Sequence, residues 1–159
     1  MLKLVLASAL ALTPLSGYAQ SSSPTALTSG FGFVALQVAD LARAEAFYVN
    51  ALGFKEIARV GKPSEPVEKA ILNLSGDPKS VGPVLILIHH AQPSPTQNRT
   101  TGTIIGFTVK DSAASAARVK AAGYTVVSQP RPGQGGAVLT SVVRDPDGVV
   151  VELVEMRAP

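Results

Sequence analysis

The chain contains no cysteine among its 159 residues. This absence excludes disulfide scaffolds, cysteine-ligated zinc or iron–sulfur sites, thiol nucleophiles and a lipid-modified cysteine anchor. Charge is also scarce, since 16% of the residues are charged and 46% are apolar, a composition that supports a buried core and argues against disorder. The 14 basic and 11 acidic residues are scattered rather than gathered in one run, so we expect no nucleic-acid partner.

The N-terminal segment lacks a hydrophobic run of membrane-spanning length. Its uncharged apolar run covers residues 4–15, whereas a spanning helix needs about 20 residues. Gly17 and Ala19 follow the run with the spacing of a signal-peptidase site. This order predicts a cleaved secretory signal peptide over residues 1–19 and a flexible Ser/Thr-rich leader over residues 20–30. We therefore expect an exported protein, periplasmic or secreted, without a stable membrane anchor.

The rest of the chain repeats itself. A β-rich run over residues 33–40 matches a second run over residues 104–111, and each ends at an aspartate that can cap a following helix. A helix is expected after each aspartate, over residues 41–52 and 112–122, and a glycine follows each helix. The further strands are expected at 55–60, 68–74 and 84–90 in the first half, and at 125–129, 137–143 and 149–156 in the second.

Each half therefore has the order strand–helix–strand–strand–strand. One such half would leave a sheet face uncovered, so two halves must combine to bury it. We predict an α+β fold in which two tandem βαβββ modules, residues 31–92 and 102–157, form a curved mixed sheet. The modules and a polar connector make up a single domain over residues 31–157.

The most specific motifs of this duplication are Val38-Ala39-Asp40-Leu41, Phe47-Tyr48, Leu52-Gly53-Phe54 and Arg144-Asp145-Pro146-Asp147-Gly148 leading into residues 151–155. With these motifs, the duplication resembles the vicinal oxygen chelate superfamily, which includes glyoxalase I, bleomycin-resistance proteins and extradiol dioxygenases. The resemblance implies the fold but does not choose among the chemistries of the superfamily. It also implies that a homodimer is an alternative to a monomer, because members often pair their halves between chains.

Metal-using members of the superfamily place one ligand on the first and fourth strands of each half. Carried over residue by residue, these four positions are Phe33, Ile86, Ile104 and Glu152. Only Glu152 offers a donor atom, while metal sites generally need at least three protein donors. We therefore expect no metal ligands and no cofactor. A divalent metal held atypically by Glu152 and His90 is the alternative.

The alternation of side chains along strands predicts a mostly apolar pocket with a few polar groups, the usual composition of a small-molecule site. Glu152 is expected to be an acid–base group or an anchor for the ligand. The alternative is that it has no functional role and that Gln37, Arg144 or water forms hydrogen bonds with its carboxylate. His90 either contacts the ligand or ends its strand in solvent. The expected ligand-binding residues are Phe33, Gln37, Ile86, His90, Ile104, Thr108 and Glu152.

Two functions follow from these features. The first is an exported, metal-independent protein of the bleomycin-resistance type that sequesters or carries a small molecule. The alternative is a divalent-metal-dependent lyase, isomerase or dioxygenase of the glyoxalase type with an atypical ligand set. The sequence does not decide whether the protein is an enzyme, but both functions give it a small-molecule partner.

Overall fold

The computed structural model describes residues 30–92 and 102–157. The predicted signal peptide, residues 20–29 of the leader and residues 93–101 of the connector lie outside the described residues. The described residues from Phe31 onward form one compact unit. Within the described ranges, no helix is long and apolar enough to cross a membrane.

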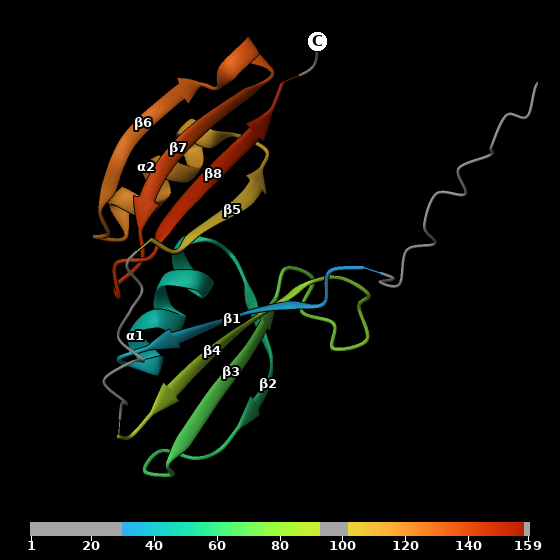
Figure 1. Cartoon of the computed structure of the whole chain (residues 1–159), viewed down its shortest axis with the longest axis vertical. Helices are drawn as coiled ribbons and strands as arrows, with labels where there is room; N and C mark the ends of the chain where they lie inside the picture. Colours follow the sequence, from blue (N-terminus) through green and yellow to red (C-terminus); the bar gives the residue numbers. More distant parts are fainter. Residues whose placement is uncertain (1–29, 93–101, 158–159) are drawn as a thin grey trace, which may run out of the picture. The chain divides into compact units, whose positions relative to one another are not determined.

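The first module contains four strands, a short α-helix and a π-helical turn (Figure 1). Its elements are β1 (Phe33–Val38), α1 (Leu41–Ala46), η1 (Phe47–Ala51), β2 (Lys55–Val60), β3 (Val67–Asn73) and β4 (Val84–His90). The strands have the order β1-β4-β3-β2, with β1 parallel to β4 and the other pairs antiparallel. Asp40 begins the helix, because its carboxylate accepts a hydrogen bond from the amide of Arg43.

The second module repeats this arrangement. Its elements are β5 (Ile104–Val109), α2 (Ser112–Ala121), β6 (Val126–Pro132), η2 (Gln134–Gly136), β7 (Val138–Arg144) and β8 (Val150–Met156). The strand order β5-β8-β7-β6 is the counterpart of the first sheet. Asp111 caps α2 through the amide of Ala114, as Asp40 caps α1. The predicted repeat of strand, helix and three strands is thus present in both halves.

The prediction that the modules form one curved sheet is wrong. The structure has two four-stranded mixed sheets. The physical reason lies in the parallel pairing, because β1 forms its ladder with β4 of its own module and β5 with β8. Each of these two strands is thus the edge strand of its own sheet, and among the described residues it pairs with no strand of the other module.

The modules pack together through their buried side chains instead. One hydrophobic cluster contains residues of both modules. The ring of Phe47 meets that of Tyr124 edge to face with centroids 4.9 Å apart, and Phe54 meets Phe107 at 5.1 Å. Such pairs add to the stabilisation from the burial of the rings. The core thus lies on the helical side of the sheets. The opposite face of each sheet is not part of this core.

Candidate functional site

The face of each sheet that points away from the helices is open. Along β1, Leu36 is buried whereas Phe33 is 59% exposed, and along β5, Ile105 is buried whereas Ile104 is 61% exposed. Successive residues of a strand point to opposite faces. Two large apolar side chains therefore lie on surfaces that water would reach in a single chain, and this is typical of binding surfaces.

The open face of the first sheet carries most of the expected pocket residues. Gln37 lies beside Ile88 in the register of β1 and β4, and Lys69 of β3 lies on the other side of Ile88. Lys69 was not among the residues expected from the sequence. The open face comprises Phe33, Ala35, Gln37, Ile86, Ile88, His90, Val67, Lys69 and Ile71.

The open face of the second sheet holds one carboxylate. Glu152 is half-buried and lies between Gly106 of β5 and Val142 of β7. A Cβ built at Gly106 would meet nothing within 4 Å, so this glycine leaves space beside the Glu152 side chain. The next acid on the strand, Glu155, has a different role, because its carboxylate accepts a hydrogen bond from the amide of Ser112 at 2.8 Å and so supports the start of α2.

The two side chains that were expected to form hydrogen bonds with the Glu152 carboxylate form other hydrogen bonds or lie on the other sheet. Arg144 donates to the carbonyl of Gly148 at 3.0 Å, and Gln37 belongs to β1 of the first sheet. Among the described residues, Glu152 has no hydrogen bond or ion pair. An acidic side chain with unused lone pairs on an apolar face is suited to binding a donor or moving a proton.

The four positions implied for a metal are divided between the two sheets. Phe33 and Ile86 are diagonal neighbours on the first sheet, and Ile104 and Glu152 are diagonal neighbours on the second. Three of these side chains are hydrocarbon and offer no donor. No group of three His, Asp or Glu side chains in the described part of the chain could hold a metal ion. The residues present therefore do not fit a conventional divalent metal centre within one chain.

His90 ends β4 beside Val67 of β3. A depression of about 440 Å³ opens there, lined by Ser64, Pro66, Val67, His90, Ala91 and Gln92. Because His90 follows Ile86 and Ile88 at intervals of two residues, this depression continues the open face of the first sheet. His89 points to the helical face, where its ring nitrogen Nδ1 lies 3.3 Å from the carbonyl oxygen of Val38.

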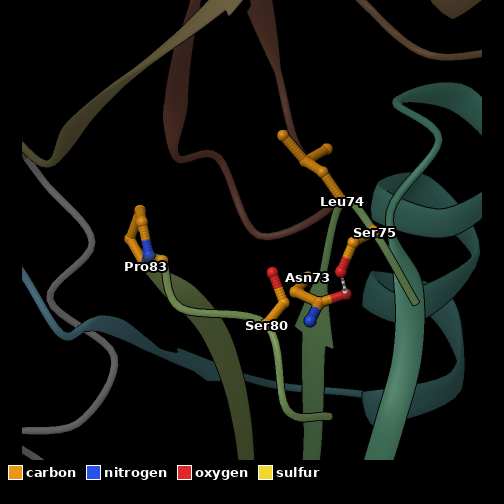
Figure 2. Close-up of a pocket in the computed structure, with 6 residues that line it drawn as sticks. Asn73, Leu74, Ser75, Ser80 and Pro83 are labelled. Carbon is orange, nitrogen blue, oxygen red and sulfur yellow. Dashed lines mark hydrogen bonds between the residues drawn. The ribbon is translucent and has the colours of Figure 1, made fainter. Parts of the chain in front are cut away.

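A second depression, of about 220 Å³, lies in the loop between β3 and β4 (Figure 2). Its polar groups are largely used by the loop itself. The Asn73 side chain accepts a hydrogen bond from the Gly76 amide at 2.6 Å and donates to the Asp77 carbonyl at 2.8 Å. Figure 2 shows its hydrogen bond with Ser75, while Leu74 extends to one side. This depression therefore has few polar groups left to bind a substrate or transfer a proton.

The turn between β7 and β8 joins the two modules through a buried pair. The Tyr48 hydroxyl donates to Asp145 Oδ2 at 3.0 Å, and these residues are 0% and 5% exposed. Burial raises the pKa of both groups, and the charge of Asp145 raises the pKa of Tyr48 further. The amides of Asp147 and Val149 donate to the other carboxylate oxygen. The sequence predicted a turn here, but it did not predict the partner in the other module.

The same turn also holds the end of β1. Asp147 Oδ1 accepts hydrogen bonds from the amide of Ala39 at 3.1 Å and from the guanidinium of Arg43 at 3.0 Å. Ala39 follows directly after β1, and Glu152 lies on the strand that begins just after the turn. This turn therefore connects the strand that carries Phe33 with the strand that carries Glu152.

Comparison with known proteins shows to which family this chain belongs. Residues 30–153 match the family model described as the Glyoxalase/Bleomycin resistance protein/Dioxygenase superfamily. Lactoylglutathione lyase from Salmonella typhimurium is 28% identical over 122 residues, which cover 77% of this chain and 89% of that protein. A probable lactoylglutathione lyase from Vibrio cholerae is 29% identical, covering 77% of this chain and 87% of that protein.

Solved structures show the same fold. Glyoxalase I from Zea mays superposes with a TM-score of 0.65 at 22% sequence identity, covering 81% of this chain. The matched region is 45% of the maize chain, so this chain spans about half of that protein.

These matches correct one prediction from the sequence. The first function, a metal-independent sequestering or carrier protein of the bleomycin-resistance type, is wrong, because the curated relatives matched over most of their length are named as lyases. The comparisons favour the alternative, an enzyme of the glyoxalase type. They also show that relatives of this kind use a small-molecule substrate.

Proposed function

Because the chain belongs to the Glyoxalase/Bleomycin resistance protein/Dioxygenase superfamily, we propose that it is a glyoxalase-type lyase or isomerase acting on a small-molecule thioester. Glu152 is its acid–base group. One observation carries the assignment: among the described residues, Glu152 is the carboxylate on the open face of the second sheet, and no protein donor engages it.

The reaction named in the relatives defines what such a group must do. Cleavage of lactoylglutathione into glutathione and a 2-oxoaldehyde moves the hydrogen on C2 of the lactoyl group to the acyl carbon, while the hydroxyl proton goes to the leaving sulfur. A base must take the C2 proton and return it to the neighbouring carbon. Glu152 Oε can perform both transfers, because a carboxylate oxygen with unused lone pairs can accept a proton and give it back.

The metal that the superfamily implies has no place in this mechanism. Phe33, Ile86 and Ile104 occupy three ligand positions, and the described side chains supply no alternative set of three donors. Phe33 and the isoleucines would instead form apolar walls that exclude water. Exclusion of water strengthens the electrostatic interactions of Glu152 with a bound substrate.

We propose that the open faces are buried by a second copy of the chain in a homodimer. Each chain exposes two related apolar faces, one bearing Phe33 and the other Ile104. In a two-fold dimer the first sheet of one copy can face the second sheet of its partner, and the same contact occurs twice. Sedimentation velocity of the mature chain tests this proposal, and a monomer at catalytic concentrations would contradict it.

The enzymatic proposal is tested by turnover of lactoylglutathione. Wild type and Glu152→Gln are assayed after chelation and again with added Zn²⁺ or Ni²⁺. We expect turnover by the wild type and a loss of about 10²- to 10⁴-fold in Glu152→Gln, the range typical of a missing acid–base group. Glu155→Gln, on the same strand but facing α2, is the matched control. Equal activity of wild type and Glu152→Gln would overturn the assignment.

A further inference from the structure

We infer that Lys69 determines substrate specificity by binding a carboxylate group of a small organic anion on the open face of the first sheet. This inference deepens the proposed function, because it rests on the location of the site at the open faces. Lys69 is not one of the ligand positions that the superfamily resemblance supplies. Its place follows from the strand register.

The register sets the direction of the Lys69 side chain. Lys69 pairs with Ile88 of β4, which in turn pairs with Gln37 of β1. The next residue, Ala70, pairs with Leu87, and both are fully buried on the helical side. Because neighbouring residues on a strand point to opposite faces, Lys69 points to the open face together with Ile88 and Gln37.

No carboxylate side chain of the protein forms an ion pair with this lysine. All 11 acidic residues of the sequence lie within the described ranges, since residues 1–29, 93–101 and 158–159 contain no Asp or Glu. The three ion pairs recorded among the described residues involve Arg43 and Arg59. Glu68 is adjacent in sequence but pairs with His89, on the opposite face from Lys69.

The surroundings of Lys69 favour an anion from outside the chain. Lys69 is half-buried on an inner strand, and Val67 and Ile71 flank it along that strand on the same face. An ammonium group among apolar side chains interacts strongly with an opposite charge, because water screens it less. His90, diagonally across from Lys69 on β4, and Gln37 add hydrogen-bonding groups on the same face.

Two other cations near an open face are weaker candidates. Arg131 pairs with Thr140 on the second sheet, but it is exposed and belongs to the edge strand β6. Arg144 pairs with Val150, but it is exposed and donates to the carbonyl of Gly148. An exposed charge is screened by water and salt. The two faces therefore have different roles: the first binds the anionic end of the ligand through Lys69, and the second presents Glu152 to its reacting end.

Calorimetric binding of an unreactive probe tests this inference without requiring turnover. The probes are S-methylglutathione, which carries two carboxylates, and its diethyl ester, which carries none. We expect the wild type to prefer the acid, and Lys69→Met to weaken its binding about 10- to 100-fold. Binding of the ester should be unchanged. Lys69→Arg should retain the preference, and Lys79→Met, which removes a charge from an exposed loop, should match the wild type.

Several results would overturn the inference. These are equal binding of the acid and the ester by the wild type, no binding of either probe, or undiminished binding of the acid by Lys69→Met. A change in the sedimentation coefficient of Lys69→Met would assign the lysine to a contact between copies instead. Lys69-dependent binding without any turnover of lactoylglutathione would contradict the enzymatic proposal and leave the role of Lys69 intact.

Discussion

Two carboxylates near the last turn of the chain, Asp145 in the turn between β7 and β8 and Glu152 on β8, differ in how their oxygens are used. Asp145 accepts hydrogen bonds from Tyr48 and from two backbone amides. Glu152 has no such donor among the described residues. A carboxylate whose oxygens already accept hydrogen bonds from the protein stabilises the fold, whereas one with unused lone pairs can bind a ligand. This contrast supports a structural role for Asp145 and the proposed acid–base role for Glu152.

Removal of the Tyr48 hydroxyl should destabilise the fold. In Tyr48→Phe, the buried Asp145 loses its side-chain donor, and an unsatisfied buried carboxylate oxygen costs about 1–3 kcal/mol. Urea denaturation measures this loss. Tyr124→Phe is the matched control, because Tyr124 packs against Phe47 and its hydroxyl has no partner among the described residues. Equal stability of the two variants would contradict the role of the hydrogen bond.

The free energy of unfolding should depend on pH through the protonation of Asp145. Burial raises its folded pKa above the ordinary 3.8. The folded state therefore binds the proton more tightly than the unfolded chain, so the contribution of this group is fully present below 3.8 and is lost as the pH rises through the raised pKa. Relative to Asp145→Asn, the free energy of unfolding of the wild type should increase from pH 7 to pH 4. A decrease over that range would contradict the assignment.

At the scale of elements, the turn between β2 and β3 depends on one glycine. Gly61 has a φ of +81°, and a Cβ at this position would collide with the backbone carbonyl oxygen of Val67. Gly123 has a similar φ of +87°, but a Cβ there would meet nothing within 4 Å. Both alanine variants carry the cost of a left-handed conformation.

Gly61→Ala should therefore lose more stability than Gly123→Ala, by at least about 1 kcal/mol, because it adds a steric clash to the shared backbone cost. Thermal or urea unfolding of the two variants measures the difference. Equal losses would show that the β2–β3 turn can move without cost.

The order of the elements could be predicted from the sequence, because strand alternation, capping aspartates and terminal glycines are local signals. The separation into two sheets could not be predicted, since it depends on which strands pair. The same limit explains why Lys69 was missed. It follows Glu68, so one charged residue must face each side of β3, and only the pairing with β4 shows which one lies on the open face. The positions of Glu152 and Ile104 required alternation alone.

At the scale of the whole molecule, we propose that the protein is exported after cleavage near Ala19. The evidence is the uncharged run over residues 4–15, followed by Gly17 and Ala19. N-terminal sequencing of the protein from its native producer should begin at or near Gln20. Retention of Met1 in the protein from that source would contradict export.

The acid–base role of Glu152 is tested most directly by isotope exchange. Lactoylglutathione is incubated with the enzyme in D₂O, and the C2 hydrogen of the lactoyl group is followed by proton NMR. A base that takes this proton and returns one after contact with solvent replaces it with deuterium. The account predicts exchange with the wild type and with Glu155→Gln, and a loss of about 10²-fold or more with Glu152→Gln. Exchange by Glu152→Gln at the wild-type rate would contradict it.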